Sequence, residues 1–445
     1  VTYDEFSRLA TVQYPAGISL SSITRDTLGR ENGTTFTVNG QAYTDSIERY
    51  VSGDIKQGTE NGTAKTYQYD NAGRLTGATV DGNTFAYEFG TPDASCSSVA
   101  GNNSNTGKNG NRTKMTVNGS ATTYCYDMAD RLIKSSDPTL TDVQYDSRGN
   151  TISLGDTNNK TEFGYDAGDR NSKIKSGDKE TLFTRDAQDR IITREHKVDG
   201  STTGSVTYGF TGSGDSPDFL QDNAGNVKQK YVTLPGDVIV TIKPDSTSAG
   251  ATTYSLPNIH GDIYLTVDAD GAVKSTHQTG PFGEQLPNQT SPQNTADGTT
   301  WNYVGQHQKL TDTDTSPISG GIIQMGARVY IPTLGRFLQV DPVEGGGDNN
   351  YVYVNDPVNE DDLDGKIAPL IAFVAWQLGR IAVQQVVKYA VKQAATQAVK
   401  QVGKKVVVQS TKKVAQKTIP KKVVQAQNYS RKLADGRINS YGKFR

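Results

Sequence analysis

The chain has 445 residues, of which 34% are hydrophobic, and its 46 glycines equal its lysines and arginines together. No apolar run reaches the roughly 18 residues that a membrane-spanning helix needs. The 22 tyrosines against three methionines indicate a β-rich protein with many tight turns. This composition argues against a large conventional enzyme core and against an integral membrane protein.

The net charge of −2 hides two regions of opposite sign. Residues 366–445 carry 17 lysines and arginines and one acid, Asp435, whereas residues 1–365 carry 29 basic and 47 acidic residues. Two charge regimes indicate two parts with different roles. The sequence starts Val-Thr-Tyr-Asp, in the middle of a pattern, and we expect a fragment of a longer polypeptide.

Cysteines and histidines are few. Cys96 and Cys125 are no disulfide framework, and the sequence leaves open whether they pair or remain two structural thiols. No histidine lies near a second His or Cys at ligand spacing, so we expect no metal site and no cofactor. The four histidines are His196, His260, His277 and His307.

A short unit recurs through the first part of the chain. Its clearest copy, residues 69–75, reads Tyr-Asp-Asn-Ala-Gly-Arg-Leu. The other copies begin with Tyr-Asp or a decayed form of it and cover residues 3–9, 126–132, 145–150, 165–170 and 185–191. From Tyr126 onward the copies start 19, 20 and 20 residues apart, a regularity that indicates a structural repeat.

Each unit has the residues of a hairpin turn. Tyr ends a strand, Asp at the first turn position accepts backbone N–H groups, and Gly, Asp or Asn three residues later takes the left-handed conformation. No single unit can bury its own face, so successive hairpins must pair into a continuous sheet. No helical periodicity appears before about residue 368. The sequence therefore predicts a mostly β fold for residues 1–365.

These repeats resemble the YD repeats of Rhs proteins, bacterial wall-associated toxins, teneurins and the C component of insecticidal toxin complexes. Downstream blocks follow the order of the same family, and the closing blocks resemble the Rhs-associated core. They are residues 260–262, 267–271, 281–284, 303–307, 326–338 and 341–359. The resemblance implies a YD-repeat β-shell segment at 1–255, an Rhs-associated core at 256–365 and a variable basic C-terminal region, the start of a toxin, at 366–445.

The resemblance also implies an architecture. In the family, YD hairpins wind into a curved sheet or shell, the core block seals one end, and the chain beyond the core is a toxin held inside. An acidic wall around a basic cargo agrees with the charges of this chain. With about seven recognisable units, we do not expect this fragment to close a full shell.

The end of the core is the place where the resemblance implies chemistry. In relatives, an aspartyl autoprotease built into the core cuts just after an Asp-Pro-x-Gly-Leu sequence and frees the toxin. The matching stretch here is residues 362–366, in which Leu363 replaces the Pro and Lys366 replaces the Leu. The resemblance therefore implies self-cleavage near Gly365–Lys366.

Two carboxylates that share a proton can activate water against a nearby amide. We expect Asp341 and Asp362 to form this pair, with Asp348 and Asp364 as second choices and Arg336 as an orienting cation. The alternative is that these aspartates cap turns and that the Asp-Gly sequence forms a hairpin loop.

After Gly365 the pattern changes to apolar residues at spacings of three and four, which predict a basic amphipathic helix over about 370–402. This helix could pack against the shell wall, act on a membrane during translocation, or belong to the toxin fold. Lysine pairs between 404 and 422 could bind nucleic-acid phosphates or form a solvated linker. We expect the toxin to be truncated in this sequence.

The leading hypothesis is the C-terminal fragment of a secreted or cell-surface Rhs-type polymorphic toxin. Such a protein encapsulates and delivers its own C-terminal toxin in bacterial competition, and its relatives require a cognate immunity protein. One alternative is an extracellular wall-associated or adhesion protein that uses YD repeats to bind a carbohydrate or a cell-surface ligand. Another is a nucleic-acid-directed toxin activity in the basic tail.

Overall fold

The computed structural model describes residues 1–287, 289, 301–345 and 347–366, all within the first of two compact units, Val1–Pro369. The helix predicted at 370–402 lies outside the described residues. The described part contains 29 strands and four short 3-10 helices and no α-helix, which confirms the mostly β prediction for this part. No helix in it is long and apolar enough to cross a membrane.

The first sheet has 12 strands in sequence order, each antiparallel to the next. Side chains alternate between buried and exposed along β9, where Phe85 and Tyr87 are buried. The strands are β1 (Thr2–Tyr3), β2 (Leu9–Gln13), β3 (Ile18–Arg25), β4 (Glu31–Val38), β5 (Gln41–Arg49), β6 (Ile55–Glu60), β7 (Thr63–Tyr69), β8 (Leu75–Val80), β9 (Asn83–Glu88), β10 (Lys114–Val117), β11 (Ser120–Tyr126) and β12 (Leu132–Ser135).

The second sheet has 13 strands, again in sequence order. It runs without interruption past residue 255 into the core block. Its strands are β13 (Gln144–Tyr145), β14 (Thr151–Leu154), β15 (Thr161–Tyr165), β16 (Asn171–Ser176), β17 (Lys179–Arg185), β18 (Ile191–Val198), β19 (Ser201–Gly209), β20 (Phe219–Gln221), β21 (Val227–Leu234), β22 (Val238–Ile242), β23 (Thr252–Pro257), β24 (Ile263–Asp268) and β25 (Val273–Thr276).

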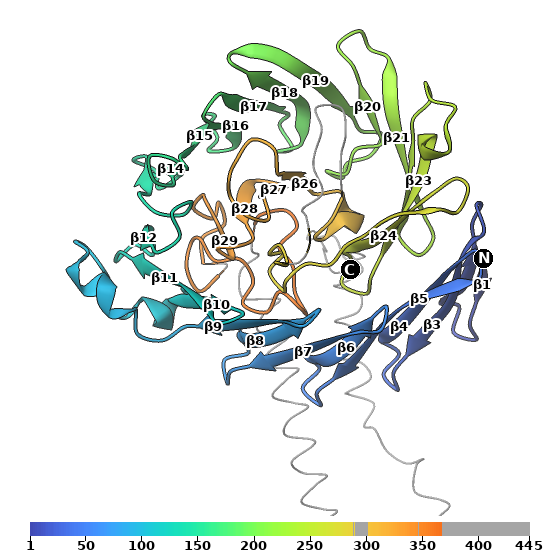
Figure 1. Ribbon diagram of the computed structural model, residues 1–445, viewed down its shortest axis with the longest axis horizontal. Helices are drawn as coiled ribbons and strands as arrows, with labels where there is room; N and C mark the ends of the chain where they lie inside the picture. Colours follow the sequence, from blue (N-terminus) through green and yellow to red (C-terminus); the bar gives the residue numbers. More distant parts are fainter. Residues whose placement is uncertain (288, 290–300, 346, 367–445) are drawn as a thin grey trace, which may run out of the picture. The chain divides into compact units, whose positions relative to one another are not determined.

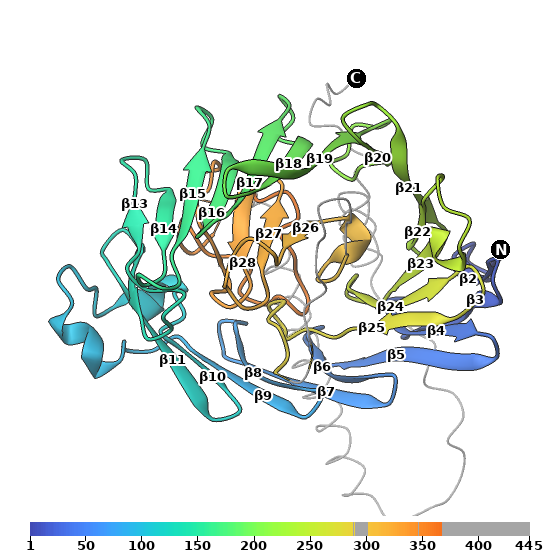
Figure 2. The ribbon, with the colours of Figure 1, turned by 45° about the horizontal axis from the view of Figure 1, so that its top comes forward.

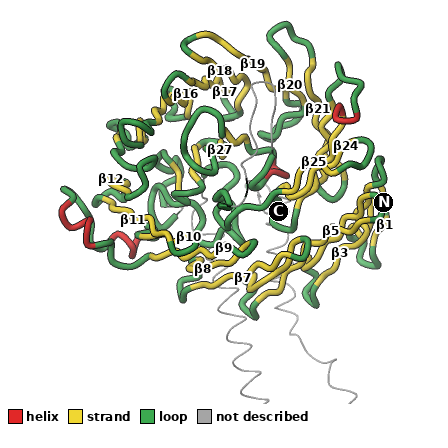
Figure 3. Tube along the Cα trace, in the orientation of Figure 1, coloured by secondary structure: helices red, strands yellow, loops and turns green. Residues whose placement is uncertain are grey.

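A small third sheet is formed by the core block. Its four strands are β26 (Leu310–Asp312), β27 (Ile322–Met325), β28 (Arg328–Ile331) and β29 (Arg336–Phe337). The 3-10 helices lie in connections and are η1 (Ala94–Ser98), η2 (Thr106–Asn109), η3 (Ala249–Ala251) and η4 (Gly305–His307). Figure 3 shows that much of the core block between these strands is loop.

The aspartate of each repeat organises its turn as the sequence predicts. Oδ1 of Asp70 accepts the backbone N–H groups of Ala72 and Arg74 at 2.9 and 3.0 Å, and Oδ2 accepts Arg74 Nε at 2.8 Å. Gly73 has a φ of +82°, in the left-handed region. The same three hydrogen bonds recur at Asp4, Asp26, Asp127, Asp166 and Asp186.

The tyrosine of the repeat links one hairpin to the one before it. In four copies its hydroxyl donates a hydrogen bond to a backbone carbonyl 13 or 14 residues earlier, over 2.7 to 3.0 Å. The pairs are Tyr69 with Ile55, Tyr126 with Arg112, Tyr145 with Leu132, and Tyr165 with Thr151. Successive hairpins are therefore fastened by side chains as well as by the strand ladder.

The wall turns back on itself. Figures 1 and 2 show the strands running round from β1 until β22–β25 lie beside β2–β5. There, Val12, Leu20 and Phe36 of the first sheet pack in one hydrophobic cluster with Val240 and Tyr254 of the second. The described strands thus make one closed turn of wall, whereas the sequence predicted only a curved strip or partial shell. The closure comes from side-chain packing, because the two sheets share no strand pairing.

The strands β26–β29 of the core block lie inside this turn (Figures 1 and 2), whereas its strands β24 and β25 are part of the wall. Tyr330, Phe337 and Tyr353 belong to a hydrophobic cluster that also contains Tyr87 and Phe163 of the two wall sheets. Burying large aromatic side chains of this kind is a major source of folding free energy. The wall therefore fixes the position of the aromatic part of the core block.

Cys96 on η1 and Cys125 on β11 form a disulfide, which settles the question that the sequence left open. We expect the variant with Cys96→Ala and Cys125→Ala to lose about 3–4 kcal/mol of unfolding free energy, because the bond closes a loop with a sequence separation of 29. Urea unfolding with and without reductant measures this loss. Reductant should leave the double variant unchanged, and an equal urea midpoint for both proteins would contradict the prediction.

Candidate active site

Arg328 is the centre of a buried cluster at the end of the core block. It begins β28, and 1% of its surface is exposed. Its Nη2 lies 2.8 Å from Asp362 Oδ2 and 2.9 Å from Asp341 Oδ2, so one nitrogen holds both carboxylates. Its guanidinium carbon lies over the ring of Phe337, 3.7 Å from the centroid, in a cation–π contact.

The same arginine contacts the peptide bond between Gly365 and Lys366. Arg328 Nε donates to the carbonyl oxygen of Gly365 at 2.7 Å. The N–H of Lys366 donates to Asp362 Oδ1 at 2.9 Å and to Asp364 Oδ1 at 3.0 Å. Both ends of one amide are therefore held by charged groups of a carboxylate–arginine cluster.

Glycine is required on both sides of this contact. Gly365 has a φ of +65°, and a Cβ there would stand 2.3 Å from the carbonyl oxygen of Met325. Gly326, with a φ of +58°, approaches the carbonyl of Asp364 in the same way, and the N–H of Ala327 donates to that carbonyl at 2.9 Å. The chain end docks on the β27–β28 turn because neither backbone carries a side chain at the point of approach.

Burial raises the pKa of Asp362 to about 6, against the opposing effect of Arg328, and nearby Asp364 adds to the rise. Burial also lowers the pKa of Arg328 from its ordinary value. Two carboxylates and one cation in a nearly dry cluster favour uptake of one proton. The cluster can therefore supply both a carboxylic acid and a carboxylate near neutral pH, as aspartyl chemistry requires.

The structure brings together the predicted pair, Asp341 and Asp362, which are 21 positions apart in the sequence. Asp364 lies at the exposed edge of the cluster, on the Lys366 N–H. Asp348 lies elsewhere, where its Oδ2 accepts Asn355 Nδ2 at 2.8 Å.

The structure places Arg336 away from the two aspartates, and Arg328 is the arginine that contacts both of them. Arg336 on β29 donates to Asn111 Oδ1 at 3.0 Å and stacks over Tyr126 and Tyr351. Both arginines belong to the core motif at 326–338, so the sequence contained the right residue. It could not show which arginine faces the aspartates, because that depends on how β28 and β29 pair.

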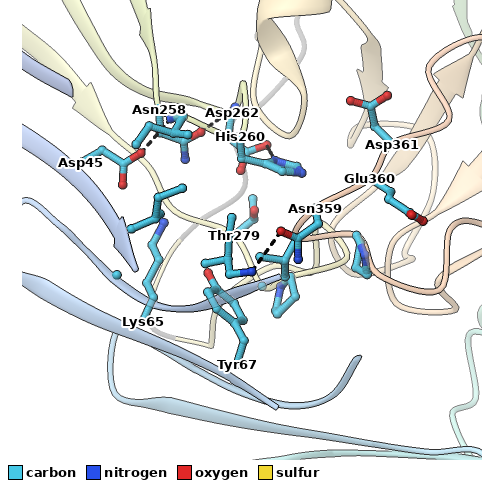
Figure 4. Close-up of a pocket in the computed structure, with 18 of the residues that line it drawn as sticks. Asp45, Lys65, Tyr67, Asn258, His260, Asp262, Thr279, Asn359, Glu360 and Asp361 are labelled. Atoms are coloured by element: carbon cyan, nitrogen blue, oxygen red, sulfur yellow. Dashed lines mark hydrogen bonds and ion pairs between the residues drawn. The ribbon is translucent and has the colours of Figure 1, made fainter. Parts of the chain in front are cut away.

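A second feature is a polar cavity of about 300 Å³ between the wall and the core block (Figure 4). Asp45, Lys65 and Tyr67 of β5 and β7 line one side, and His260 and Asp262 of the β23–β24 turn line another. Burial lowers the pKa of His260, but Asp262, 3.1 Å from Nδ1, more than offsets this and raises it to about 9. Burial also raises the pKa of Asp45 to about 6, despite Lys65.

The carboxylates of Asp45 and Asp262 in this cavity bind backbone N–H groups of the core block. Asp45 Oδ2 accepts the N–H of Ile259 at 2.7 Å, and Asp262 Oδ1 accepts the N–H of Val304 at 2.7 Å. The sequence singled out His260 only as a histidine without a second His or Cys at ligand spacing, and its partner Asp262 is two positions away. No group of His, Cys, Asp and Glu in the described part of the chain could hold a metal ion.

Comparison with known proteins supports the class that the fold and repeats define. No protein-family model matches the chain. It is 27% identical over 325 residues to a tRNA3(Ser)-specific nuclease WapA of Bacillus spizizenii, and 27% identical to the tRNA nuclease WapA of Bacillus subtilis, covering 70% of this chain in each case. The chain spans 11% of the length of these relatives.

Two solved structures share the fold. The Tc holotoxin pore of Photorhabdus luminescens, with a TccC3 mutation, matches 83% of this chain and 19% of its own, at 19% identity and a TM-score of 0.62. The crystal structure of TcdB2–TccC3 matches 82% and 19%, at 18% identity and a TM-score of 0.60. The fold and these matches confirm the resemblance to Rhs/YD-repeat proteins that the sequence indicated. The wall has the fold of the matching part of these Tc toxin structures, and the chain is similar in sequence to WapA.

Proposed function

We propose that this chain is part of an Rhs-type toxin shell that carries its residues after the core as cargo and cuts itself at the Gly365–Lys366 bond, one bond before the point that the match to Asp-Pro-x-Gly-Leu implies. The observation that carries the proposal is the pair of contacts on that bond. Arg328 holds its carbonyl oxygen and Asp362 its amide nitrogen, and Asp341 sits on the same arginine.

The contacts define the reaction. Asp341 takes a proton from a water molecule, whose oxygen attacks the carbonyl carbon of Gly365. Arg328 Nε stabilises the negative charge that develops on the carbonyl oxygen. Asp362, protonated, gives its proton to the nitrogen of Lys366, whose lone pair is freed once the carbon is tetrahedral. The C–N bond then breaks to give a carboxylic acid at Gly365 and an amine at Lys366. The proton of that acid passes to the amine, which becomes an ammonium, and transfer of the proton of Asp341 to Asp362 restores the pair.

The charges support a cargo role for the region after the core. The 17 basic residues and one acid of 366–445 complement the acidic excess of 1–365, and such complementarity favours retention over escape. The Cys96–Cys125 disulfide suits an oxidising compartment, which supports a secreted or cell-surface location. An immunity partner would follow from the same role.

A second candidate is a nucleic-acid-directed activity of residues 366–445. The observations that favour it are the density of lysine and arginine in this region and the names of the WapA relatives, which are tRNA nucleases. Clustered basic residues bind phosphates with an affinity that falls steeply with salt. This activity and self-cleavage are compatible in one protein.

The proposal is tested by incubating the purified chain and following it on a denaturing gel between pH 5 and 9. We expect two fragments whose masses correspond to residues 1–365 and 366–445. Because the acid form of Asp362 is needed and its pKa is about 6, the rate should rise as the pH falls through 6 and drop about tenfold per pH unit above it.

The Asp364→Asn variant is a suitable control for the pH profile, since it removes a carboxylate that faces the same N–H but is exposed. Its profile should keep the same shape with a small displacement. A chain that stays intact across the whole pH range overturns the proposed self-cleavage. A rate that increases with pH above 6 shows that Asp362 does not act as the acid.

A further inference from the structure

The side chain next to the proposed cleavage bond is held by the wall and not by the core block. Lys366 Nζ lies 2.7 Å from Asp189 Oδ2, across 177 positions of sequence. Asp189 belongs to the turn between β17 and β18, the decayed repeat at 185–191, and has a φ of +67°. The β17–β18 hairpin turn of the wall therefore contacts Lys366, the residue whose N–H is bound by Asp362.

The decayed repeat differs from the others in a way that serves this contact. Arg185 stands where the copies that begin with Tyr-Asp have Tyr, and the Asp26 turn has an arginine, Arg25, at the same position. Its Nε donates to the carbonyl of Asn171 at 3.1 Å, 14 residues earlier, which is the bond that the tyrosine hydroxyl makes elsewhere. Its Nη1 reaches further and donates to the carbonyls of Asp189 at 2.7 Å and Gly326 at 3.0 Å.

Arg185 therefore ties two turns together. One is its own turn, which presents Asp189 to Lys366. The other is the β27–β28 turn at Gly326, on which Asp364 docks. Its Nη2 also bonds Gln324 Oε1 on β27 at 2.5 Å. Replacing tyrosine by arginine keeps the link between hairpins and adds a link to the cleavage segment.

We propose that the decayed repeat is a specificity element for self-cleavage, in which Asp189 binds the Lys366 ammonium and so positions the Gly365–Lys366 bond against Arg328 and Asp362. This inference rests on the proposed self-cleavage and deepens it. Asp189 is a positioning residue, because it acts through Lys366 and touches neither atom of the bond. Asp189 would recognise a cationic side chain on the residue that follows the cleaved bond.

The expected effect is moderate, because the pair is partly open to solvent. The side chains of Lys366 and Asp189 are 38% and 24% exposed, and ion pairs of this kind contribute up to about 1 kcal/mol, or about fivefold in a rate. Misplacing the bond adds to this loss. Asp189→Asn should therefore slow self-cleavage about 5- to 10-fold and make it less sensitive to salt.

Asp169→Asn is the matched control. Asp169 is the corresponding residue of the preceding repeat, has a φ of +61°, and pairs with Arg148 at 2.8 Å. Asparagine tolerates the left-handed conformation at both positions. The Asp169→Asn chain should be cut at the parent rate and at the same bond.

A double-mutant cycle separates positioning from a structural role. In a Lys366→Met background, adding Asp189→Asn should have no further effect, because the interaction is already absent. The reversed pair, Asp189→Lys with Lys366→Asp, should recover part of the rate lost by either single change. Fragment masses show in each case which bond is cut.

The outcomes distinguish this inference from the function on which it rests. If Asp362→Asn blocks cleavage but Asp189→Asn is cut like the parent, the positioning role is wrong and self-cleavage stands. The positioning role is equally wrong if Asp189→Asn slows the Lys366→Met chain as much as the parent. If the parent is never cut, both proposals fall together.

Discussion

Replacing either Asp341 or Asp362 by asparagine is expected to slow self-cleavage by about 10³-fold or more. Asparagine has nearly the same shape and can still accept the hydrogen bonds of Arg328 and Lys366, so the fold should be retained. It can neither take a proton from water nor deliver one to the amide nitrogen, and loss of an acid or base in a pair of this kind costs about 10²- to 10⁴-fold.

The measurement is the time course of fragment formation at pH 6, with intact mass for each variant. Asp348→Asn is the control, because this carboxylate lies on Asn355 and not on Arg328. It should behave like the parent. Equal cleavage of the Asp362→Asn and Asp348→Asn chains would show that the buried pair plays no chemical role and that these aspartates only hold the turn.

Removing the cation is expected to produce the largest loss of stability. In Arg328→Met, two carboxylates that are 4% and 3% exposed remain together without a partner. Breaking a buried ion pair from one side costs about 3–5 kcal/mol, because an uncompensated charge stays buried. We expect a loss of this size in the free energy of unfolding by urea at pH 8, where cleavage is slow, and no cleavage.

Arg336→Met is the matched comparison, since Arg336 is buried in the same small sheet but its contacts are an amide, a backbone carbonyl and two tyrosine rings. The Arg336→Met variant should therefore lose less unfolding free energy than the Arg328→Met variant. Adding Asp341→Asn and Asp362→Asn to the Arg328→Met chain should restore much of the stability, since the repulsion is gone. Equal losses for the two arginines, without this recovery, would contradict the charge argument.

The proposed cleavage and the docking of residues 362–366 depend on the same two side chains, those of Arg328 and Asp362. In the intact protein, Arg328, Asp362 and Gly365 hold the last described residues against the β27–β28 turn. The proposed hydrolysis would replace the amide at Lys366 by an ammonium beside Asp362. The cut chain would therefore keep a charged contact with the core at the new terminus.

The sequence by itself determined the local structure of this protein. The aspartate turn, the glycine or aspartate in the left-handed position and the hairpin ladder all involve residues within a few positions of one another, such as Asp70 and Arg74. Contiguous residues encode such contacts, because they depend on backbone geometry and side-chain reach alone. The choice of Asp341 and Asp362 came from the resemblance, since Asp341 stands in a core block and Asp362 begins the stretch that matches the cleavage sequence of relatives.

Only the tertiary structure decided the rest. Three features depend on the tertiary structure: which arginine contacts the aspartates, the closure of the wall, and the contact of Asp189 with Lys366. Each brings together residues whose distance in space depends on the curvature of the whole wall. Each repeat adds a register shift at its turn, as between Thr184 and Arg185, and bulges of this kind set twist and curvature. The small changes in strand direction at these bulges add up over the 25 strands of the two wall sheets. The overall curvature therefore cannot be predicted from any short segment of the sequence.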